Sequence, residues 1–506
     1  MGYCGTLLQG ADMEAPIGVE GLVREAIDPL RDTLVDTIHW QINTDPYFGS
    51  LSTHLTDWFS HDTKIGPRWG DGWATFKTAG EWRIYENARQ IMASGTDPLH
   101  VVIEHGHRAG LDVCLSMRFN DGHDHRLPGG LADQNMSPIK REHPDWLLGP
   151  GVGDYSRFGY NFAIPEVRRY RMDLVAETVG NYDLDGLDFD FCRWPILFPR
   201  GEGAARAHLL TGMLRQSRRL LEDKSAKVGR RLLLSARVPF DLVAAKQEGM
   251  DAAVWIKESI VDVLIVAGTG GSWNYRLPIE DYKALAAGTG CRIVAQNLDG
   301  FKEGRPRSAH VLFDERDYYN TEMHRAVAAR HWQAGADGIY IWNQDWVRFV
   351  KDGKFDPQSW KEIGSPEVLA RLDKHYLVGP EGRGGSLPKS LARSGEGVEI
   401  NLEVADDFGA AARQKIPVES TLRLMVDQLT KLDQIEYELN GVKLDPATAL
   451  KRYNYSECWC DFVVSGILKQ GRNLLKLAVR SRNPQVEAPL VIRSVEALVK
   501  YRENNV

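Results

Sequence analysis

The chain repeats one pattern, in which short apolar or β-branched runs alternate with stretches of helical periodicity. Eight such runs can be counted, and a helical stretch precedes each of the second to eighth. They cover residues 3–8, 35–43, 112–119, 186–191, 231–238, 261–268, 292–298 and 338–343. Strands that alternate with helices favour a parallel sheet, and eight such units close into a (β/α)₈ barrel. We therefore predict an α/β barrel over residues 1–378.

The sequence changes in character after the predicted barrel. Residues 379–388, "GPEGRGGSLP", are rich in glycine and proline and are typical of a linker. Residues 389–506 contain short alternating runs such as "GVEINLEV" and "NLLKLAVRS", separated by turn residues. They predict an all-β, jelly-roll-like sandwich domain. Two roles stay open for it, a structural cap on the barrel and carbohydrate binding.

Composition excludes several classes of partner. The chain of 506 residues is 43% hydrophobic and 26% charged, which is ordinary for a globular protein. No apolar run approaches the roughly 18 residues of a membrane helix. The 62 basic and 69 acidic residues give a net charge of −7 and form no basic stripe, so we expect neither a membrane nor nucleic acid as partner. The six cysteines lie too far apart for a disulfide framework and are interpreted as free thiols, mostly buried.

One predicted strand carries an unusual number of acids. The segment "DLDGLDFDFCRWP" spans residues 183–195. Asp183 and Asp185 fall in the turn before the strand, where aspartate is common, and we assign them structural roles. Asp188 and Asp190 share one face of the strand and are expected to point into the barrel lumen. Two interpretations stay open: a buried ion pair with Arg193, Arg118 or Arg237, or catalysis by Asp190 with Asp188 raising its pKa or sharing its proton.

The carboxyl ends of barrel strands are where such folds place catalytic groups. The chain offers carboxylates, amides, arginines and tryptophans at these ends, a set that suits a sugar. As candidate catalytic carboxylates we name Asp190, Asp188, Asp345, Asp299 and Asp121. The candidate substrate-binding residues are Arg118, Asn120, His123, Arg193, Arg237, Trp273, Asn297, Trp342 and Asn343. We expect no cofactor and no metal, because histidines 123 and 125 of "HDH" are interpreted as loop residues that bind sugar or solvent.

Several stretches resemble a known family. "PEVRRYRMDLVAETVGN" followed by "YDLDGLDFDFCRWPILF" looks like the fourth-strand region of glycoside-hydrolase-like family 10 barrels and their bacterial, planctomycete- and marine-type relatives. "MRFNDGHD", "EHPDWLLG" and "GADGIYIWN" also resemble parts of those proteins. The resemblance extends over most of residues 1–375. It implies Asp190 as the fourth-strand acid with Arg193 as its neighbour, and Arg118, Asn120, Asp121 and His123 along the cleft.

A second resemblance is partial. The family 18 chitinase signature DGxDxDxE matches Asp185, Gly186, Asp188 and Asp190, but its catalytic glutamate falls at Cys192. A thiol is a poor proton donor to a glycosidic oxygen, so chitinase-type hydrolysis is not expected. Glycosidases generally use two carboxyl groups. The sequence does not identify the second.

These observations predict a glycoside hydrolase that acts on an oligo- or polysaccharide. The long segments 44–97 and 120–158 favour exo action, and the strand-end arginines favour an acidic or sulfated sugar. A non-catalytic carbohydrate-binding barrel and a sugar-acid lyase or isomerase remain alternatives. The first residues lack the features of a signal peptide, which predicts a cytoplasmic protein if Met1 is the natural start and a periplasmic or secreted one if a signal peptide has been removed. The sequence does not indicate an oligomeric state.

Overall fold

Two compact units make up the chain. The first contains Met1–Gly271, Pro278–Gln296 and Ala336–Trp342, and the second contains Ser272–Leu277, Asn297–Gly335 and Asn343–Val506. The computed structural model describes residues 1–5, 18–42, 93–120, 138–153, 156–192, 194–268, 276–297, 320–342, 357–379, 386–393 and 397–502, with isolated residues between 83 and 91 and at 395.

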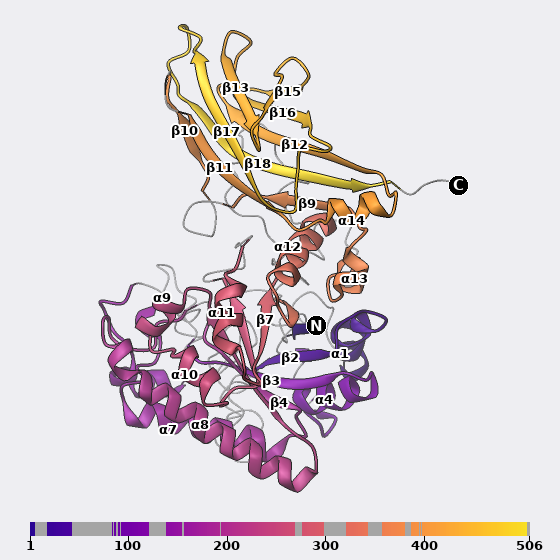
Figure 1. Cartoon of the computed structure of the whole chain (residues 1–506). Coiled ribbons are helices and arrows are strands. Elements are labelled where there is room, and N and C mark those ends of the chain that lie inside the picture. The colour runs from indigo at the N-terminus through magenta and orange to yellow at the C-terminus, as the bar shows by residue number, and fades with distance from the viewer. Residues whose placement is uncertain are drawn as a thin grey trace. The chain divides into compact units, whose positions relative to one another are not determined.

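The first unit is a closed barrel of eight parallel strands, which confirms the predicted fold class (Figure 1). The strands follow one another around the barrel in sequence order, and β8 pairs with β1. They are β1 (Gly2–Gly5), β2 (Thr37–Ile42), β3 (Asp112–Arg118), β4 (Gly186–Asp190), β5 (Leu233–Pro239), β6 (Val263–Ala267), β7 (Arg292–Gln296) and β8 (Gly338–Ile341). Each lies within or next to one of the eight apolar runs.

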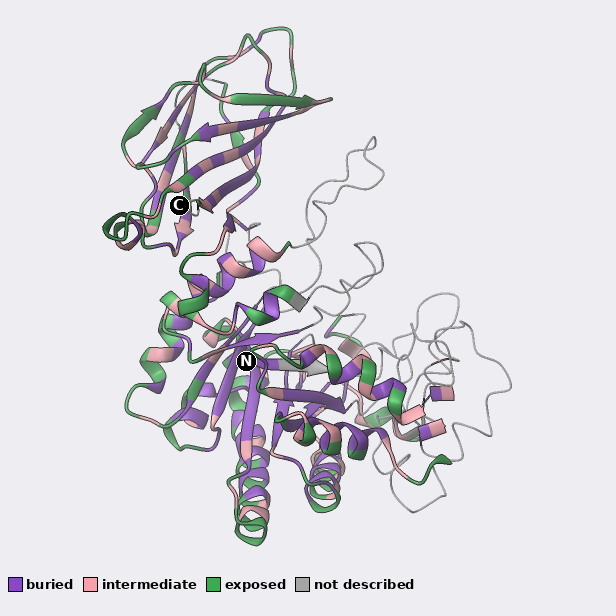
Figure 2. Ribbon diagram, turned by 90° about the vertical axis from the view of Figure 1, so that its right-hand side faces the viewer, coloured by how far each residue is buried: buried purple, intermediate pink, exposed green. Residues whose placement is uncertain are grey.

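Helices cover the outside of the barrel strands. They include α1 (Gly18–Ala26), α4 (Pro98–Arg108), α7 (Pro165–Asn181), α8 (Gly203–Val228), α9 (Leu242–Gln247), α10 (Ala252–Lys257) and α11 (Ile279–Ala286). Local chemistry sets their ends: the Asp97 side chain accepts hydrogen bonds from the first backbone amides of α4, and Gly229 ends α8 with a φ of 71°. Figure 2 shows the strands buried and the helices exposed along their outer faces.

Strand β4 presents two chemically different faces. Leu187 and Phe189 are fully buried, and the Phe189 ring packs against that of Phe119, with their centroids 4.8 Å apart. The alternate residues Asp188 and Asp190 contact side chains of β3 and β5 on the opposite face. Gly186 is required at the start of the strand because a Cβ atom there would lie 2.5 Å from the Leu233 carbonyl oxygen.

The second unit is built mainly from two antiparallel sheets, as predicted for the C-terminal region. One contains β10 (Lys389–Leu391), β18 (Leu490–Tyr501), β12 (Val418–Asp427), β16 (Glu457–Val463) and β15 (Leu450–Asn454), with β9 (Lys374–Leu377) added to β18. The other contains β11 (Val398–Val404), β17 (Gly471–Ser481), β13 (Gln434–Leu439) and β14 (Val442–Leu444). Alternate residues such as Ile400, Leu402 and Leu424 fill one apolar core.

The second unit differs from the predicted domain division. Strand β9 pairs with β18, so the sheet begins at residue 374, before the predicted linker at 379–388. The unit also includes α12 (Thr321–Gln333), which packs on β9, as well as α13 (Pro366–Leu369) and α14 (Phe408–Arg413). A helix and a strand that the sequence order assigns to the barrel domain therefore pack with the sandwich.

Candidate active site

The register of three neighbouring strands sets the position of the two central aspartates. Asp188 lies level with Ser116 on β3 and Ser235 on β5. Asp190, two residues nearer the carboxyl end, lies level with Arg118 and Arg237 on the same two strands. Each aspartate is therefore flanked on both sides, one by hydroxyl groups and the other by guanidinium groups.

A histidine ring and two hydroxyl groups hold Asp188 in its ionised form. The Ser116 and Ser235 Oγ atoms each donate to a different oxygen of its carboxylate at 2.6 Å, and the His39 Nδ1 lies 3.7 Å from Oδ2. Burial alone would raise the pKa of Asp188, but the His39 ring and the two hydroxyls outweigh it and lower that pKa below its ordinary value. Asp188 is therefore a hydrogen-bond acceptor and a fixed negative charge.

Asp190 forms the buried ion pair that the sequence offered as one of two interpretations. The Arg237 Nη1 lies 2.8 Å from its Oδ1 and 3.0 Å from its Oδ2, and both side chains are 1% exposed. The backbone amide of Cys192 donates to Oδ1 at 2.9 Å, and Arg118 Nε lies 3.8 Å from Oδ2. Asp190 is therefore contacted by one arginine and one backbone amide that donate to its oxygens, with a second arginine nearby.

Arg237 is itself held by side chains from β7 and from the end of β8. Its Nε donates to Gln296 Oε1 at 2.8 Å, and the guanidinium lies 4.5 Å from the centroid of the Trp342 ring. A planar guanidinium can bind a carboxylate at its edge and an aromatic ring on its face. The structure thus brings four of the predicted site residues together: Asp190, Arg118, Arg237 and Trp342.

Sequence reasoning missed several polar side chains of this lumen. They are His39, Gln41, Ser116, Ser235 and Gln296, all buried. The alternation of side chains along a strand could have identified them. Each of these residues either lies an even number of positions from another lumen-facing residue of its own strand or is level with a lumen-facing residue of the neighbouring strand. The Nε2 atoms of Gln41 and Gln296 are buried and have no hydrogen-bond partner in the part of the chain that the structure describes.

Cys192 occupies the position of the chitinase glutamate and is fully buried. Burial raises the pKa of its thiol to about 12, with a smaller opposing effect from the Arg237 charge. The thiol is therefore neutral near pH 7 and neither nucleophilic nor acidic enough for catalysis. Cys114, Cys192, Cys291, Cys458 and Cys460 are all free and buried, which agrees with the interpretation from the sequence.

Asn120 serves as a structural clamp. Its Nδ2 donates to the carbonyl oxygens of Tyr160 and Ile196, at 3.2 and 2.8 Å, and its Oδ1 accepts from the Tyr160 amide at 2.8 Å. These bonds connect Asn120, just after β3, with Tyr160, which precedes α7, and with Ile196, which follows β4. Because they engage both amide hydrogens, the predicted contact of Asn120 with a substrate remains a prediction without support from this geometry.

The remaining predicted residues fall into three groups. Asp183 and Asp185 pair with Arg230 at the start of β4, which agrees with their assigned structural roles. Asn297 follows β7, and its Nδ2 donates to the His324 carbonyl oxygen at 3.2 Å within the second unit. Outside the described residues lie Asp121, His123, Arg193, Trp273, Asp299, Asn343 and Asp345.

Among the described residues, no group of three His, Cys, Asp or Glu side chains is arranged to hold a metal ion. A search of the same residues for a long apolar helix that could cross a membrane found none.

The fold and the lumen define a (β/α)₈ barrel with two buried carboxylates on its fourth strand. Residues 24–195, which include both aspartates, match the sequence model of a family described as "Glycosyl hydrolase-like 10". This match confirms the resemblance that the motifs of the fourth-strand region indicated.

Two curated relatives cover a similar part of the chain. The chain is 31% identical to "Glycosyl hydrolase DigH" of Escherichia coli (strain K12) over 103 residues, which are 19% of this chain and 22% of the relative. It is 30% identical to "Glycosyl hydrolase YngK" of Bacillus subtilis (strain 168) over 119 residues, 23% of this chain and 22% of the relative. The matches thus span about a fifth of each relative's length. They support a resemblance to glycosyl hydrolases in general.

Solved structures with a similar chain course are more distant in sequence. An endo-beta-1,4-mannanase from Thermotoga petrophila is 11% identical, with a TM-score of 0.45 and coverage of 98% of this chain and 97% of that one. An alpha-amylase from Geobacillus thermoleovorans is 14% identical, with a TM-score of 0.41 and coverage of 96% and 98%.

Proposed function

We propose that the barrel is a glycoside hydrolase that cleaves an oligo- or polysaccharide at the carboxyl ends of its strands. The proposal rests on the buried carboxylate of Asp190 at the end of β4, within the segment similar to the glycosyl hydrolase-like family. Barrel enzymes hold their catalytic groups at this end of the strands. An isolated buried charge is costly, so a carboxylate kept there is a good candidate for function.

The contacts of the two aspartates suit negative charge rather than proton donation. An ionised Asp190 can act as a nucleophile or stabilise the positive charge that develops on the sugar ring during cleavage. Asp188, bonded to two hydroxyls one layer deeper, supports the lumen but accepts rather than donates. The proton donor must then be a third carboxylic acid, for which Asp121, Asp299 and Asp345 are the candidates.

The guanidinium groups of the lumen favour an acidic or sulfated substrate. Arg118 and Arg237 lie beside Asp190 at the strand ends, one layer nearer the carboxyl end than the negative charge of Asp188. Guanidinium groups bind carboxylate and sulfate through paired hydrogen bonds. The unpartnered amide nitrogens of Gln41 and Gln296 add donors for sugar oxygens in the described part of the lumen. Exo action, favoured by the long strand-end segments, is part of the same proposal.

The test measures reducing-sugar release from a glycan panel that includes uronate-containing and sulfated polymers. The wild type is compared with Asp190→Asn and with Asp223→Asn, which removes an exposed carboxylate on α8. We expect release to fall at least about a thousandfold in Asp190→Asn, in line with the loss of one transition-state group, and to stay unchanged in the control. Circular dichroism and melting curves establish that both variants are folded. Equal activity of Asp190→Asn and wild type would disprove the assignment.

One observation favours a second function. Arg237 contacts both oxygens of Asp190, and Cys192 stands where the chitinase signature has glutamate. A barrel in which the central acid is permanently paired can bind a glycan without cleaving it. Wild-type protein that binds a glycan of the panel by calorimetry but releases no reducing sugar from any of them would establish this non-catalytic alternative.

A further inference from the structure

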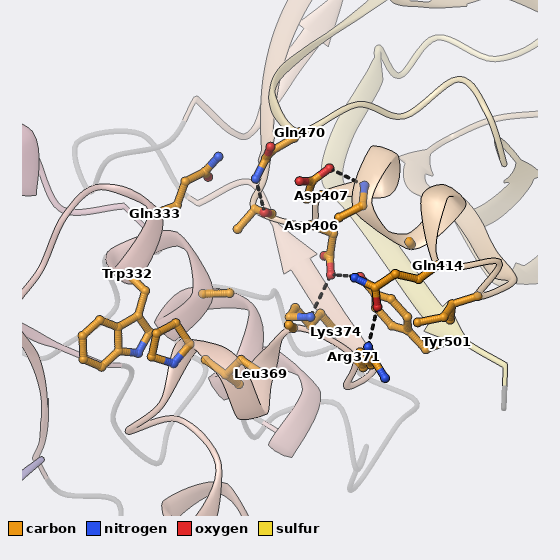
Figure 3. A pocket seen from close by; sticks show the side chains of 17 residues that line it. Trp332, Gln333, Leu369, Arg371, Lys374, Asp406, Asp407, Gln414, Gln470 and Tyr501 are labelled. Carbon is orange, nitrogen blue, oxygen red and sulfur yellow. Dashed lines mark hydrogen bonds and ion pairs between the residues drawn. The ribbon is translucent and has the colours of Figure 1, made fainter.

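The second unit contains a hollow of about 330 Å³ outside its sandwich core. Its lining comes from α12, α13, α14, β9 and β18 and from the turns next to them, all within that unit. Figure 3 shows Trp332 and Gln333 on one side of the hollow, and Gln414 and Tyr501 on the other. Protein interiors contain few voids larger than a water molecule, whereas ligand pockets begin at about 300 Å³.

Small side chains keep the hollow open beside the indole ring of Trp332. Five alanines line it, at positions 329, 370, 405, 410 and 411. The Trp332 Nε1 donates to the Ile363 carbonyl oxygen at 2.9 Å, which fixes the orientation of the indole. A rigid aromatic ring next to open space offers a flat apolar surface for a ligand of matching shape.

The charged groups at the base of the hollow neutralise one another. The Lys374 Nζ donates to Asp406 Oδ1 at 2.7 Å, and the hydroxyls of Tyr376 and Tyr501 each donate to the same carboxylate at 2.6 Å. Burial lowers the pKa of Lys374, and the Asp406 charge opposes this effect. This network is closed on itself, and the other two charged residues of the lining, Arg371 and Asp407, carry opposite charges. The lining therefore offers no net charge to a ligand, which argues for a neutral one.

The rim supplies neutral hydrogen-bonding groups. Gln333, Gln414 and Gln470 are exposed and line the hollow from α12, α14 and the turn before β17. The Gln470 Nε2 donates to the Ala405 carbonyl oxygen at 2.9 Å, and the Gln414 Oε1 accepts from the Arg371 Nη2. These bonds hold both side chains at the rim and leave the Gln470 Oε1 and the Gln414 Nε2 for a ligand. Amide groups donate and accept at once, as hydroxyl groups do.

We propose that this hollow binds one neutral sugar residue, with an apolar ring face on Trp332 and its hydroxyls on the glutamine amides. An apolar wall with a few convergent polar groups is the general form of a small-molecule site. The proposal does not depend on hydrolysis by the barrel.

The test uses four neutral probes, which are methyl β-glucoside, methyl β-galactoside, methyl α-mannoside and N-acetylglucosamine, with glucuronate as the acidic comparison. Binding is measured by saturation-transfer NMR and located by hydrogen-exchange mass spectrometry. We expect at least one neutral probe to bind and to protect peptides 329–333 and 405–416. Glucuronate should bind more weakly to this site because Lys374 is already paired with Asp406 and the lining carries no net charge.

Two leucine substitutions on α14 provide a matched pair. Ala410→Leu fills the hollow, and Ala412→Leu places the same side chain on the exposed side of the same helix. The first should weaken binding at least about tenfold, the effect of modest steric overpacking, whereas the second should leave it unchanged. Melting curves show whether both variants keep the fold.

Four results would overturn the proposal. The first three are the absence of binding by any neutral probe, binding that Ala410→Leu leaves intact in a folded protein, and protection confined to the barrel strands. The fourth is preference for an apolar probe such as cyclohexylmethanol over all four sugars, which would refute the sugar assignment. Sugar binding by the second unit can be measured whether or not Asp190→Asn loses hydrolysis, because Asp190 lies in the barrel unit.

Discussion

The pair between Asp190 and Arg237 gives a quantitative test of the barrel interior. Arg237→Met removes the guanidinium, keeps much of the side-chain volume and leaves the Asp190 carboxylate buried. Both groups are 1% exposed, and breaking such a pair costs about 3–5 kcal/mol. Arg118 Nε, 3.8 Å from the carboxylate, compensates part of the charge, so we expect the lower end, about 3 kcal/mol. At roughly 2–4 °C per kcal/mol, the melting temperature of the barrel should fall by about 6–12 °C.

The assay is urea unfolding of Arg237→Met, Asp190→Asn and the double variant. The double variant should be more stable than the sum of the two single losses predicts, because neither partner of the Asp190–Arg237 pair is left charged. Arg215→Met is the matched control: its partner Glu258 is 45% exposed, and loss of such a surface pair costs about 1 kcal/mol or less. Additive single losses, or a cost no larger than that of Arg215→Met, would refute the reasoning.

Further predictions concern single lumen residues. The pKa of Asp188 is lowered in the folded protein. The ionised Asp188 side chain therefore stabilises the fold above about pH 3.9, the ordinary pKa of aspartate, and this stabilisation is lost as pH falls through the lowered pKa. Ser116→Ala should therefore cost about 1.5–3 kcal/mol at pH 7 in urea titrations, and progressively less toward pH 3. The Cys192 thiol should resist iodoacetamide at pH 8 in the native state and react after unfolding, as read by mass spectrometry. Asn120→Ala should speed hydrogen exchange of the Tyr160 amide, with a stability loss of about 1–3 kcal/mol, and unchanged exchange there would contradict its clamping role.

The architecture of the barrel was predictable because its signals are local. Apolar runs bounded by turn residues mark strands whether or not their partners are known, and all eight overlap observed strands. In the second unit, alternation of buried and exposed residues along β11 and β17 identifies strands equally well. Strand β9 was missed as a member of the sandwich. Its four residues, Lys374–Leu377, carry no alternation of their own, and only the long-range pairing with β18 defines their place.

The site was only partly predictable, because the sequence identifies lumen residues but not their partners. Three arginines were equally good candidates for pairing with Asp190. The choice of Arg237 follows from the register between β4 and β5, and register in a barrel is set by closure of all eight strands together. The hydrogen bonds of Ser116 and Ser235 to Asp188 have the same origin. No local signal distinguishes a serine that supports a buried carboxylate from one that only fills a strand.

The same register constrains what chemistry the fourth strand can perform. Because side chains alternate, the lumen positions of β4 are residues 188 and 190, and Cys192 continues their series immediately after the strand. The chitinase pattern needs its proton donor at this third position, and a neutral buried thiol cannot supply the proton. With Asp188 and Asp190 both held as acceptors, hydrolysis by this barrel requires an acid from a different strand end. We therefore expect a catalytic barrel to lose activity on substitution of one of the candidate acids Asp121, Asp299 or Asp345, or of an acid in the loops, whereas a binding barrel need not.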